Sequence, residues 1–295
     1  GGSLAEAAPF RLGASALNGG LIRATPIYAN GMLYFSAPDH VWAVDARTGK
    51  QAWHFLWNTR GGEYTGNRGV AVWNNTVYVG TPDGHLAALD ARTGAQRWFK
   101  QVGNFLENYY SSTAPVVIGN HLLVGLSGDS LDVPAWIESR DLETGEIQWK
   151  WYTTPPVGSA DAKTWPNEDA MRHGGGMTWQ PVTYDPQLRL VYVATGNPNP
   201  MYDFEVRKGD NLYSCSIVAL DVDTGKMRWY YQTAQNEAWD FDTNQVPVLI
   251  DTELEGKPRK LVAQATRNGL YFLLDRETGK HILTTAPYEA VHWFT

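Results

Sequence analysis

The chain has 295 residues, enough to bury a large hydrophobic core, and a single all-β domain can reach this length. Its 13 Trp, 15 Tyr, 29 Gly and 16 Pro, with only 19% charged residues, favour short strands joined by tight turns over helices. The net charge of −7 argues against a nucleic-acid-binding protein, which needs a basic stripe; the only basic cluster, residues 257–260, is expected to be a solvated loop.

One motif, Asp-x-x-Thr-Gly-x-x-x-Trp, recurs along the chain at a spacing typical of propeller blades. Alternating segments at residues 32–35 and 41–44, and again at 76–79 and 86–89, precede the first two copies and predict half-buried strands. The five copies span residues 45–53, 90–98, 141–149, 221–229 and 275–283, and the last has Leu283 in place of Trp.

The Asp-x-x-Thr-Gly part of the motif predicts a turn between the third and fourth strands of a blade. Asp can bond its own backbone two residues on, and Gly accepts a positive φ. The Trp that follows is expected to pack between neighbouring blades, with its N–H bonded to a carbonyl. The predicted fold is therefore an all-β propeller of four-stranded antiparallel blades, a single domain over residues 1–295. Because propellers close with about 4 to 8 blades, five motifs predict an incomplete ring in this chain.

Two long irregular segments interrupt the repeat. Residues 154–169 fall between the third and fourth motifs, whose Asp residues are 80 apart, and residues 198–210 separate strands of one blade. A loop as long as the first is either functional or disordered in a compact domain. We expect both segments to wall a site.

Cys215 is the only cysteine, so the chain can form no internal disulfide and no cysteine-based zinc site, and a small buried residue is expected there. No run of about 18 apolar residues is present, which predicts no transmembrane segment. The first residues lack the basic n-region and the apolar h-region of a secretory signal peptide. We expect a soluble chain from which any signal peptide has been removed.

Oxygen-bearing side chains gather near glycine clusters, and hard cations prefer such ligands. Asp240 and Asp242 would share one face of an extended segment and could converge on one ion or one proton. Without a cation the pair would repel, and one pKa would rise. Glycine-rich nucleotide loops and the zinc-protease motif are absent, and Ser127 lacks the spacing of a hydrolase nucleophile.

Several segments of the chain resemble the quinoprotein alcohol dehydrogenases, which use pyrroloquinoline quinone. The likeness runs from about residue 22 to the end, and its clearest parts are residues 184–186, 191–198, 209–213, 216–221, 223–229 and 267–276. Those enzymes are eight-bladed propellers, and the resemblance implies that this chain corresponds to their first five or so blades.

The resemblance implies a role for each matching residue. Trp179 would form the floor on which the quinone stacks, Asn197 would ligate the metal, and Asp240 would be both general base and metal ligand. The physical chemistry agrees, because the base takes the alcohol proton, the metal polarises a quinone carbonyl and the cofactor accepts the hydride. Further implied contacts to the cofactor are Arg68, Thr113, Ser127, Met177, Thr178 and Arg267.

The metal site departs from the family's pattern at one ligand. Ser130 stands where the family has a metal-binding Glu, so Asp129 or Asp132 is expected to replace it. Asp242, two residues after the base, resembles the lanthanide-dependent members, but two or three carboxylates fit either calcium or a lanthanide. The family's vicinal cysteine pair is also absent.

The leading hypothesis from the sequence is an oxidoreductase. It would oxidise a primary alcohol or aldehyde with bound pyrroloquinoline quinone and calcium or a lanthanide, and pass electrons to a cytochrome c. The resemblance implies a periplasmic location, and a homodimer is one assembly to expect. The alternative is a non-catalytic propeller that serves as a binding or assembly scaffold, which Ser130 and the absent cysteine pair would suit.

Overall fold

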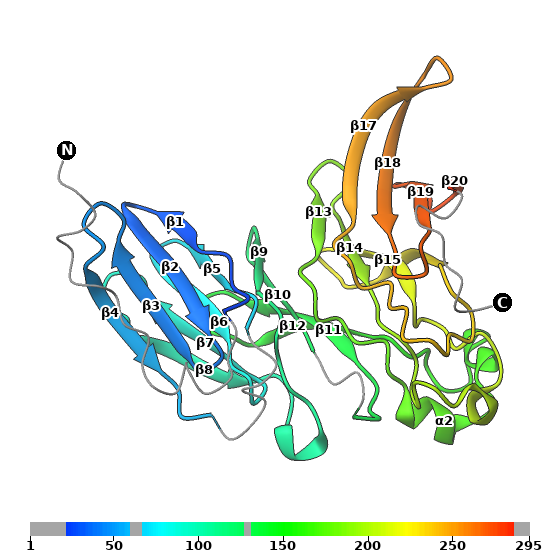
Figure 1. The fold of residues 1–295 in the computed structure, drawn as a ribbon, viewed down its shortest axis with the longest axis horizontal. Helices are drawn as coiled ribbons and strands as arrows, with labels where there is room; N and C mark the ends of the chain where they lie inside the picture. The colour runs from blue at the N-terminus through cyan, green and yellow to red at the C-terminus, as the bar shows by residue number, and fades with distance from the viewer. Residues whose placement is uncertain (1–21, 60–66, 127–130, 286–295) are drawn as a thin grey trace. The chain divides into compact units, whose positions relative to one another are not determined.

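A computed structural model describes residues 22–59, 67–126 and 131–285 of the chain. Within these ranges, twenty strands form five four-stranded antiparallel sheets, each in chain order (Figure 1). The chain divides into two compact units, Gly1–Ser127 with Arg140–Glu146, and Gly128–Ser139 with Ile147–Thr295.

The first two sheets lie in the first unit. One consists of β1 (Ile27–Ala29), β2 (Met32–Ala37), β3 (His40–Asp45) and β4 (Gln51–Leu56). The other consists of β5 (Val70–Trp73), β6 (Thr76–Gly80), β7 (His85–Asp90) and β8 (Gln96–Gln101), followed by the short 3₁₀ helix η3 (Phe105–Glu107). The third sheet is formed by β9 (Val116–Ile118), β10 (His121–Gly125), β11 (Trp136–Asp141) and β12 (Ile147–Tyr152).

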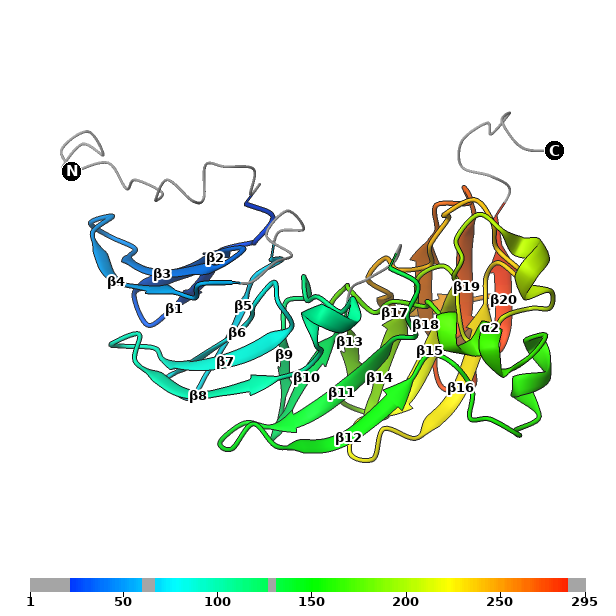
Figure 2. The ribbon, with the colours of Figure 1, turned by 90° about the horizontal axis from the view of Figure 1, so that it is seen from below.

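The last two sheets lie next to one another in the second unit (Figure 2). The fourth sheet consists of β13 (Thr183–Asp185), β14 (Leu190–Ala194), β15 (Ser216–Asp221) and β16 (Met227–Gln232). The fifth consists of β17 (Val248–Leu254), β18 (Lys257–Ala265), β19 (Tyr271–Asp275) and β20 (His281–Thr284). The basic cluster at residues 257–260 is largely exposed, but it begins strand β18 and is not the loop that was expected.

The repeated motif forms the predicted turn. Asp45 Oδ1 accepts hydrogen bonds from the backbone N–H groups of Arg47 (3.1 Å) and Thr48 (2.7 Å), directly between β3 and β4. The glycine that follows, Gly49, has a φ of 69°, which only a residue without a Cβ adopts readily. Carboxylate bonds of the same kind hold the turns at Asp90, Asp141, Asp221 and Asp275.

Each motif tryptophan packs on the next sheet, as predicted. Trp53 Nε1 donates to the carbonyl of Ala91 (2.8 Å), and Trp229 Nε1 donates to the carbonyl of Arg276 (3.2 Å). The glycine of the following motif lies against the indole: a Cβ at Gly94 would be 2.8 Å from the Trp53 ring. The motif glycine therefore has two roles, since it makes its own turn and gives space to the tryptophan of the preceding blade.

Each unit has its own apolar core between facing sheets. In the first unit Tyr34, Val41 and Trp53 pack against Val77, Val79 and Leu89. In the second unit Tyr192, Ile217 and Trp229 pack against Val262 and Leu274. Cys215 is buried, as predicted. No helix among the described residues has the length and apolar character needed to span a bilayer.

The two irregular segments carry short helices of the second unit. Residues 154–169 contain the 3₁₀ helix η4 (Asp161–Thr164) and the start of α2 (Glu168–His173), and residues 198–210 contain η5 (Phe204–Arg207). Buried Trp165 anchors the first segment by donating from Nε1 to the carbonyl of Leu212 (2.6 Å). The first segment is thus an ordered loop.

Candidate functional site

In the second unit, a cluster of charged and amide side chains forms where the loops after β14, β16 and β18 meet. Asp242 is buried, and its Oδ1 accepts the backbone N–H of Asn197 (3.0 Å). Its Oδ2 accepts from Nη1 of Arg267 (2.9 Å), whose Nη2 lies 3.4 Å from Oδ2 of Asp240. The structure therefore brings together four of the predicted site residues.

The backbone that carries the two carboxylates is not the extended segment that was expected. Asp240 has a φ of 62° and Asp242 a φ of 43°, both in the left-handed region that residues with a Cβ seldom occupy. Such residues are held by their surroundings and concentrate at functional sites. The two carboxylates nevertheless meet, at the guanidinium of Arg267.

Burial raises the pKa of Asp242 to about 6, and the negative charge of Asp240 adds to the rise. The N–H of Asn197 and the Arg267 guanidinium oppose it. The repulsion that was expected within the carboxylate pair therefore contributes to the rise, but burial is its larger cause. A cation between the two carboxylates would remove their repulsion and keep Asp242 ionised.

Asn197 has a side-chain oxygen suited to a cation. The residue is 1% exposed, and its Nδ2 donates to the carbonyl of Pro198 (3.1 Å). Its Oδ1 is buried and has no hydrogen-bond partner among the described residues. A buried oxygen of this kind is costly unless something binds it. An amide oxygen beside two carboxylates fits a hard cation.

The glycine triplet, residues 174–176, packs against the backbone of Asn197. The N–H of Gly176 donates to the carbonyl of Asn197 (2.8 Å), and a Cβ at Gly175 would lie 2.5 Å from the same oxygen. Close approach of two backbones thus requires glycine here. Trp179, three residues further, is half-buried.

Met177 and Thr178, both predicted to contact the quinone, are buried in the second unit. The carbonyl of Met177 accepts the N–H of Gly196 (2.9 Å), and the Thr178 hydroxyl donates to the carbonyl of Trp136 (2.8 Å). The first bond ties the segment before Trp179 to the loop that carries Asn197, and the second ties it to β11. Their predicted contact with a quinone stays a prediction.

The remaining predicted site residues belong to other parts of the chain. Arg68 and Thr113 are in the first unit, where Nη1 of Arg68 donates to Oγ of Ser112 (2.5 Å) and Thr113 is buried. Ser127 and Asp129 lie outside the described residues, as does Ser130. Asp132 is half exposed, and its Oδ2 lies 2.6 Å from Nδ1 of His173.

Across residues 22–59, 67–126 and 131–285, no group of three or more His, Cys, Asp or Glu side chains is arranged to hold a metal. The cation site that the described residues offer is therefore two carboxylates and an amide oxygen. A third carboxylate, expected from Asp129 or Asp132, stays a prediction.

The sequence profile of the glucose/ethanol/alcohol dehydrogenase β-propeller family, which is named for pyrroloquinoline quinone, matches residues 11–289. The chain belongs to this family. Membership confirms the family resemblance and the propeller fold that were predicted.

Curated relatives of this dehydrogenase family are longer than the chain. It is 38% identical over 292 residues to quinohemoprotein alcohol dehydrogenase ADH IIB of Pseudomonas putida, a match that covers 92% of the chain and 42% of the relative. It is 34% identical over 294 residues to quinoprotein alcohol dehydrogenase PedH of the same species, with 92% and 49% covered. The chain thus spans less than half the length of these two relatives.

Solved structures of the family are similar to the chain and are likewise longer than it. A europium-containing methanol dehydrogenase is 33% identical with a TM-score of 0.85, and the match covers 91% of this chain and 51% of that one. The quinohemoprotein alcohol dehydrogenase of Comamonas testosteroni is 37% identical with a TM-score of 0.83, with 92% and 44% covered.

Two buried residues beside the cluster, Asn244 and Glu237, were not predicted from the sequence. Asn244 donates from Nδ2 to the carbonyl of Met177 (2.5 Å), which links the loop after Asp242 to the segment before Trp179. Glu237 lies three residues before Asp240 and is also buried. The only signal in the sequence was their nearness to Asp240 and Asp242, because their roles depend on how the loop folds.

Proposed function

We propose that the protein is a quinoprotein dehydrogenase that oxidises a primary alcohol or aldehyde. Pyrroloquinoline quinone would be its cofactor, calcium or a lanthanide its cation, and a cytochrome c its electron acceptor in the periplasm. The observation that carries the proposal is the buried, unpartnered Oδ1 of Asn197 beside the carboxylate pair of Asp240 and Asp242. Membership of the family and the names of its relatives, several of them quinohemoproteins, support the reaction and the acceptor.

The residues of the cluster have separate tasks in this proposal. Asp242 and Asn197 would hold the cation with Asp240, because all three present hard oxygen ligands. Bound pyrroloquinoline quinone would supply the two-electron oxidant, and the cation a Lewis acid beside it. Trp179 would give the quinone a flat apolar floor.

Asp240 would act as the general base. Its side chain is 28% exposed, whereas that of Asp242 is 4% exposed, so Asp240 is the carboxylate that a substrate hydroxyl can reach. It would take the hydroxyl proton of the alcohol as the carbonyl group forms. Arg267, which pairs with both carboxylates, would keep Asp240 oriented.

Titration of the protein with pyrroloquinoline quinone, after loading with calcium or with europium, tests the proposal. We expect saturable binding that depends on one of the two cations, and dye-linked oxidation of a primary alcohol that Asp240→Ala abolishes. Asp223→Asn is the matched control, because Asp223 is an exposed carboxylate paired with Arg189 away from the cluster. No quinone binding with either cation would overturn the proposal.

A second candidate function is a non-catalytic propeller that serves as a binding or assembly scaffold. The observation that favours it is Arg267, whose guanidinium already pairs with both carboxylates and supplies the positive charge that a cation would bring. A protein that shows neither quinone binding nor dye-linked alcohol oxidation after loading with either cation would support this function over the first.

A further inference from the structure

Glu237 is a buried carboxylate in the loop that leads to Asp240. It is 3% exposed, and its Oε1 accepts the backbone N–H of Trp239. The backbone N–H of Phe241 also bonds to this carboxylate. The two N–H groups belong to the residues on either side of Asp240, so Glu237 binds the backbone on both sides of the proposed base.

The loop needs such bonds because of its backbone conformation. Asp240 and Asp242 both have positive φ angles, 62° and 43°, and neither is a glycine. A conformation of this kind persists only where surrounding contacts hold it. The carboxylate of Glu237 supplies two such contacts within the loop itself.

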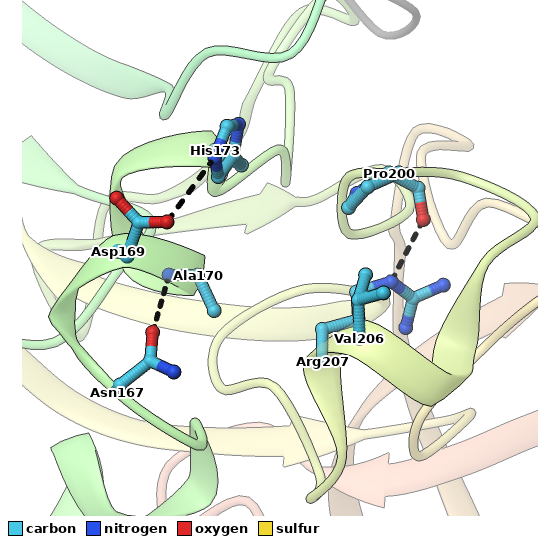
Figure 3. A pocket seen from close by; sticks show the side chains of 7 residues that line it. All are labelled: Asn167, Asp169, Ala170, His173, Pro200, Val206 and Arg207. Atoms are coloured by element: carbon cyan, nitrogen blue, oxygen red, sulfur yellow. Dashed lines mark hydrogen bonds and ion pairs between the residues drawn. The ribbon is translucent and has the colours of Figure 1, made fainter.

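Glu237 is in turn fixed by a buried arginine. Arg207 is fully buried, and its Nη2 donates to the backbone carbonyls of Glu237 and Met201, the latter at 2.8 Å. Its Nε donates to the carbonyl of Pro200 (2.9 Å), as Figure 3 shows. Arg207 therefore ties the start of the Asp240 loop to the segment that follows Asn197.

The carboxylate of Glu237 has no other task among the described residues. Its Oε2 is buried and has no hydrogen-bond partner there. Burial raises the pKa of Glu237, while the N–H groups of Trp239 and Phe241 and the positive charge of Arg207 oppose the rise. A buried acid is costly, and the N–H groups of Trp239 and Phe241 offset part of that cost, which indicates that these bonds matter.

We propose that Glu237 is a positioning residue that fixes the loop Trp239–Asp242 and so holds the carboxylates of Asp240 and Asp242 in place for a hard cation. The inference rests on the proposed function, because the cation site at Asp240 and Asp242 is part of that proposal. What Glu237 contributes is an acceptor oxygen for two N–H groups, and its charge is not required.

Terbium titration of three variants, followed by sensitised Tb³⁺ luminescence, tests whether the acceptor oxygen of Glu237 or its negative charge supports cation binding. Glu237→Ala removes the acceptor, Glu237→Asp keeps the charge but shortens the side chain by one methylene, and Glu237→Gln keeps an acceptor oxygen at full length. We expect Ala and Asp to weaken Tb³⁺ binding by about 10- to 100-fold, the usual effect of losing a residue that orients metal ligands. Gln should restore affinity to within about threefold of the unmodified protein.

Hydrogen exchange at the amides of Trp239 and Phe241, without any cation, gives a second readout. We expect faster exchange in Glu237→Ala and Glu237→Asp than in Glu237→Gln. Asp221→Ala is the matched control, since Asp221 also holds a turn through a backbone N–H, that of Thr224 (3.0 Å), at the end of β15 away from the loop. It should change neither readout.

The outcomes distinguish this inference from the proposed function. Failure of the unmodified protein to bind Tb³⁺ would overturn the proposed function and the inference with it. Tb³⁺ binding that is equally tight in Glu237→Ala and Glu237→Asp would overturn the inference alone. So would weak binding in Glu237→Gln with full affinity in Glu237→Asp, because charge would then be the property that matters.

Discussion

Replacing Asp242 by Asn is expected to stabilise the cation-free protein while it weakens the cation site. Burial and the charge of Asp240 raise the pKa of Asp242 from 3.8 to about 6. At pH 7 the carboxyl is ionised in both the folded and the unfolded protein, and the folded state disfavours the charge. A rise of about two pKa units corresponds to a loss of up to about 3 kcal/mol of folding stability. Asn removes the charge and keeps an oxygen that can accept the Asn197 N–H.

The pH dependence of unfolding tests the reasoning behind this magnitude. A carboxyl whose pKa is raised on folding contributes stability at low pH and loses it as the pH rises from 3.8 through about 6. The advantage of Asp242→Asn in urea unfolding with a chelator should therefore be about 3 kcal/mol at pH 7 and under about 1 kcal/mol at pH 4. A variant that is no more stable than the parent at pH 7, or an advantage that is equal at both pH values, would refute it.

Three further predictions concern the docking of the blades, Asn197 and His54. Trp229→Ala should lower the free energy of unfolding, measured in urea, by about 3–5 kcal/mol. Gly279→Ala should lower it by about 1–3 kcal/mol, because the added Cβ would lie 2.6 Å from the Trp229 ring. A neutral result for either variant would contradict the docking of the blades. Asn197→Ala should weaken europium binding, measured by calorimetry, at least tenfold, and unchanged affinity would remove Asn197 from the site. Burial and the neighbouring His40 lower the pKa of His54, so stability should fall as the pH drops below 6.5, and His54→Gln should flatten that fall in thermal unfolding.

The blade architecture could be predicted because the repeat encodes it locally. Asp45, Thr48 and Gly49 make their turn with one another, and the alternation before them specifies the strands. The second role of the motif glycine was not predictable, because Gly94 meets Trp53 from the preceding blade. A contact between such distant residues leaves no trace in the short pattern of either.

The candidate site could be predicted in part. The resemblance selected Asn197, Asp240, Asp242 and Arg267, and the structure brings these four together. The positive φ angles of the two Asp residues and the loop-binding role of Glu237 could not be predicted, because they arise from backbone bonds within an irregular loop. Periodicity and motif spacing describe regular elements and carry no information about such a loop.

The structure supports the different tasks that are proposed for the two carboxylates, because their exposures differ. By sequence, Asp240 and Asp242 are equivalent members of a pair, and only the resemblance singles out Asp240 as the base. The structure buries Asp242 and leaves Asp240 partly exposed, and it gives the Asn197 N–H to Asp242. The ligand that replaces the family's Glu stays a prediction, because Asp129 lies outside the described residues.

The most direct test of the account is a crystal structure of the protein grown with europium and pyrroloquinoline quinone, with an anomalous difference map at the europium edge. The account predicts a single strong peak within about 2.3–2.6 Å of Asn197 Oδ1 and of carboxylate oxygens of Asp240 and Asp242, with the quinone stacked on Trp179. A europium peak elsewhere, or a quinone that binds away from Trp179, would contradict it.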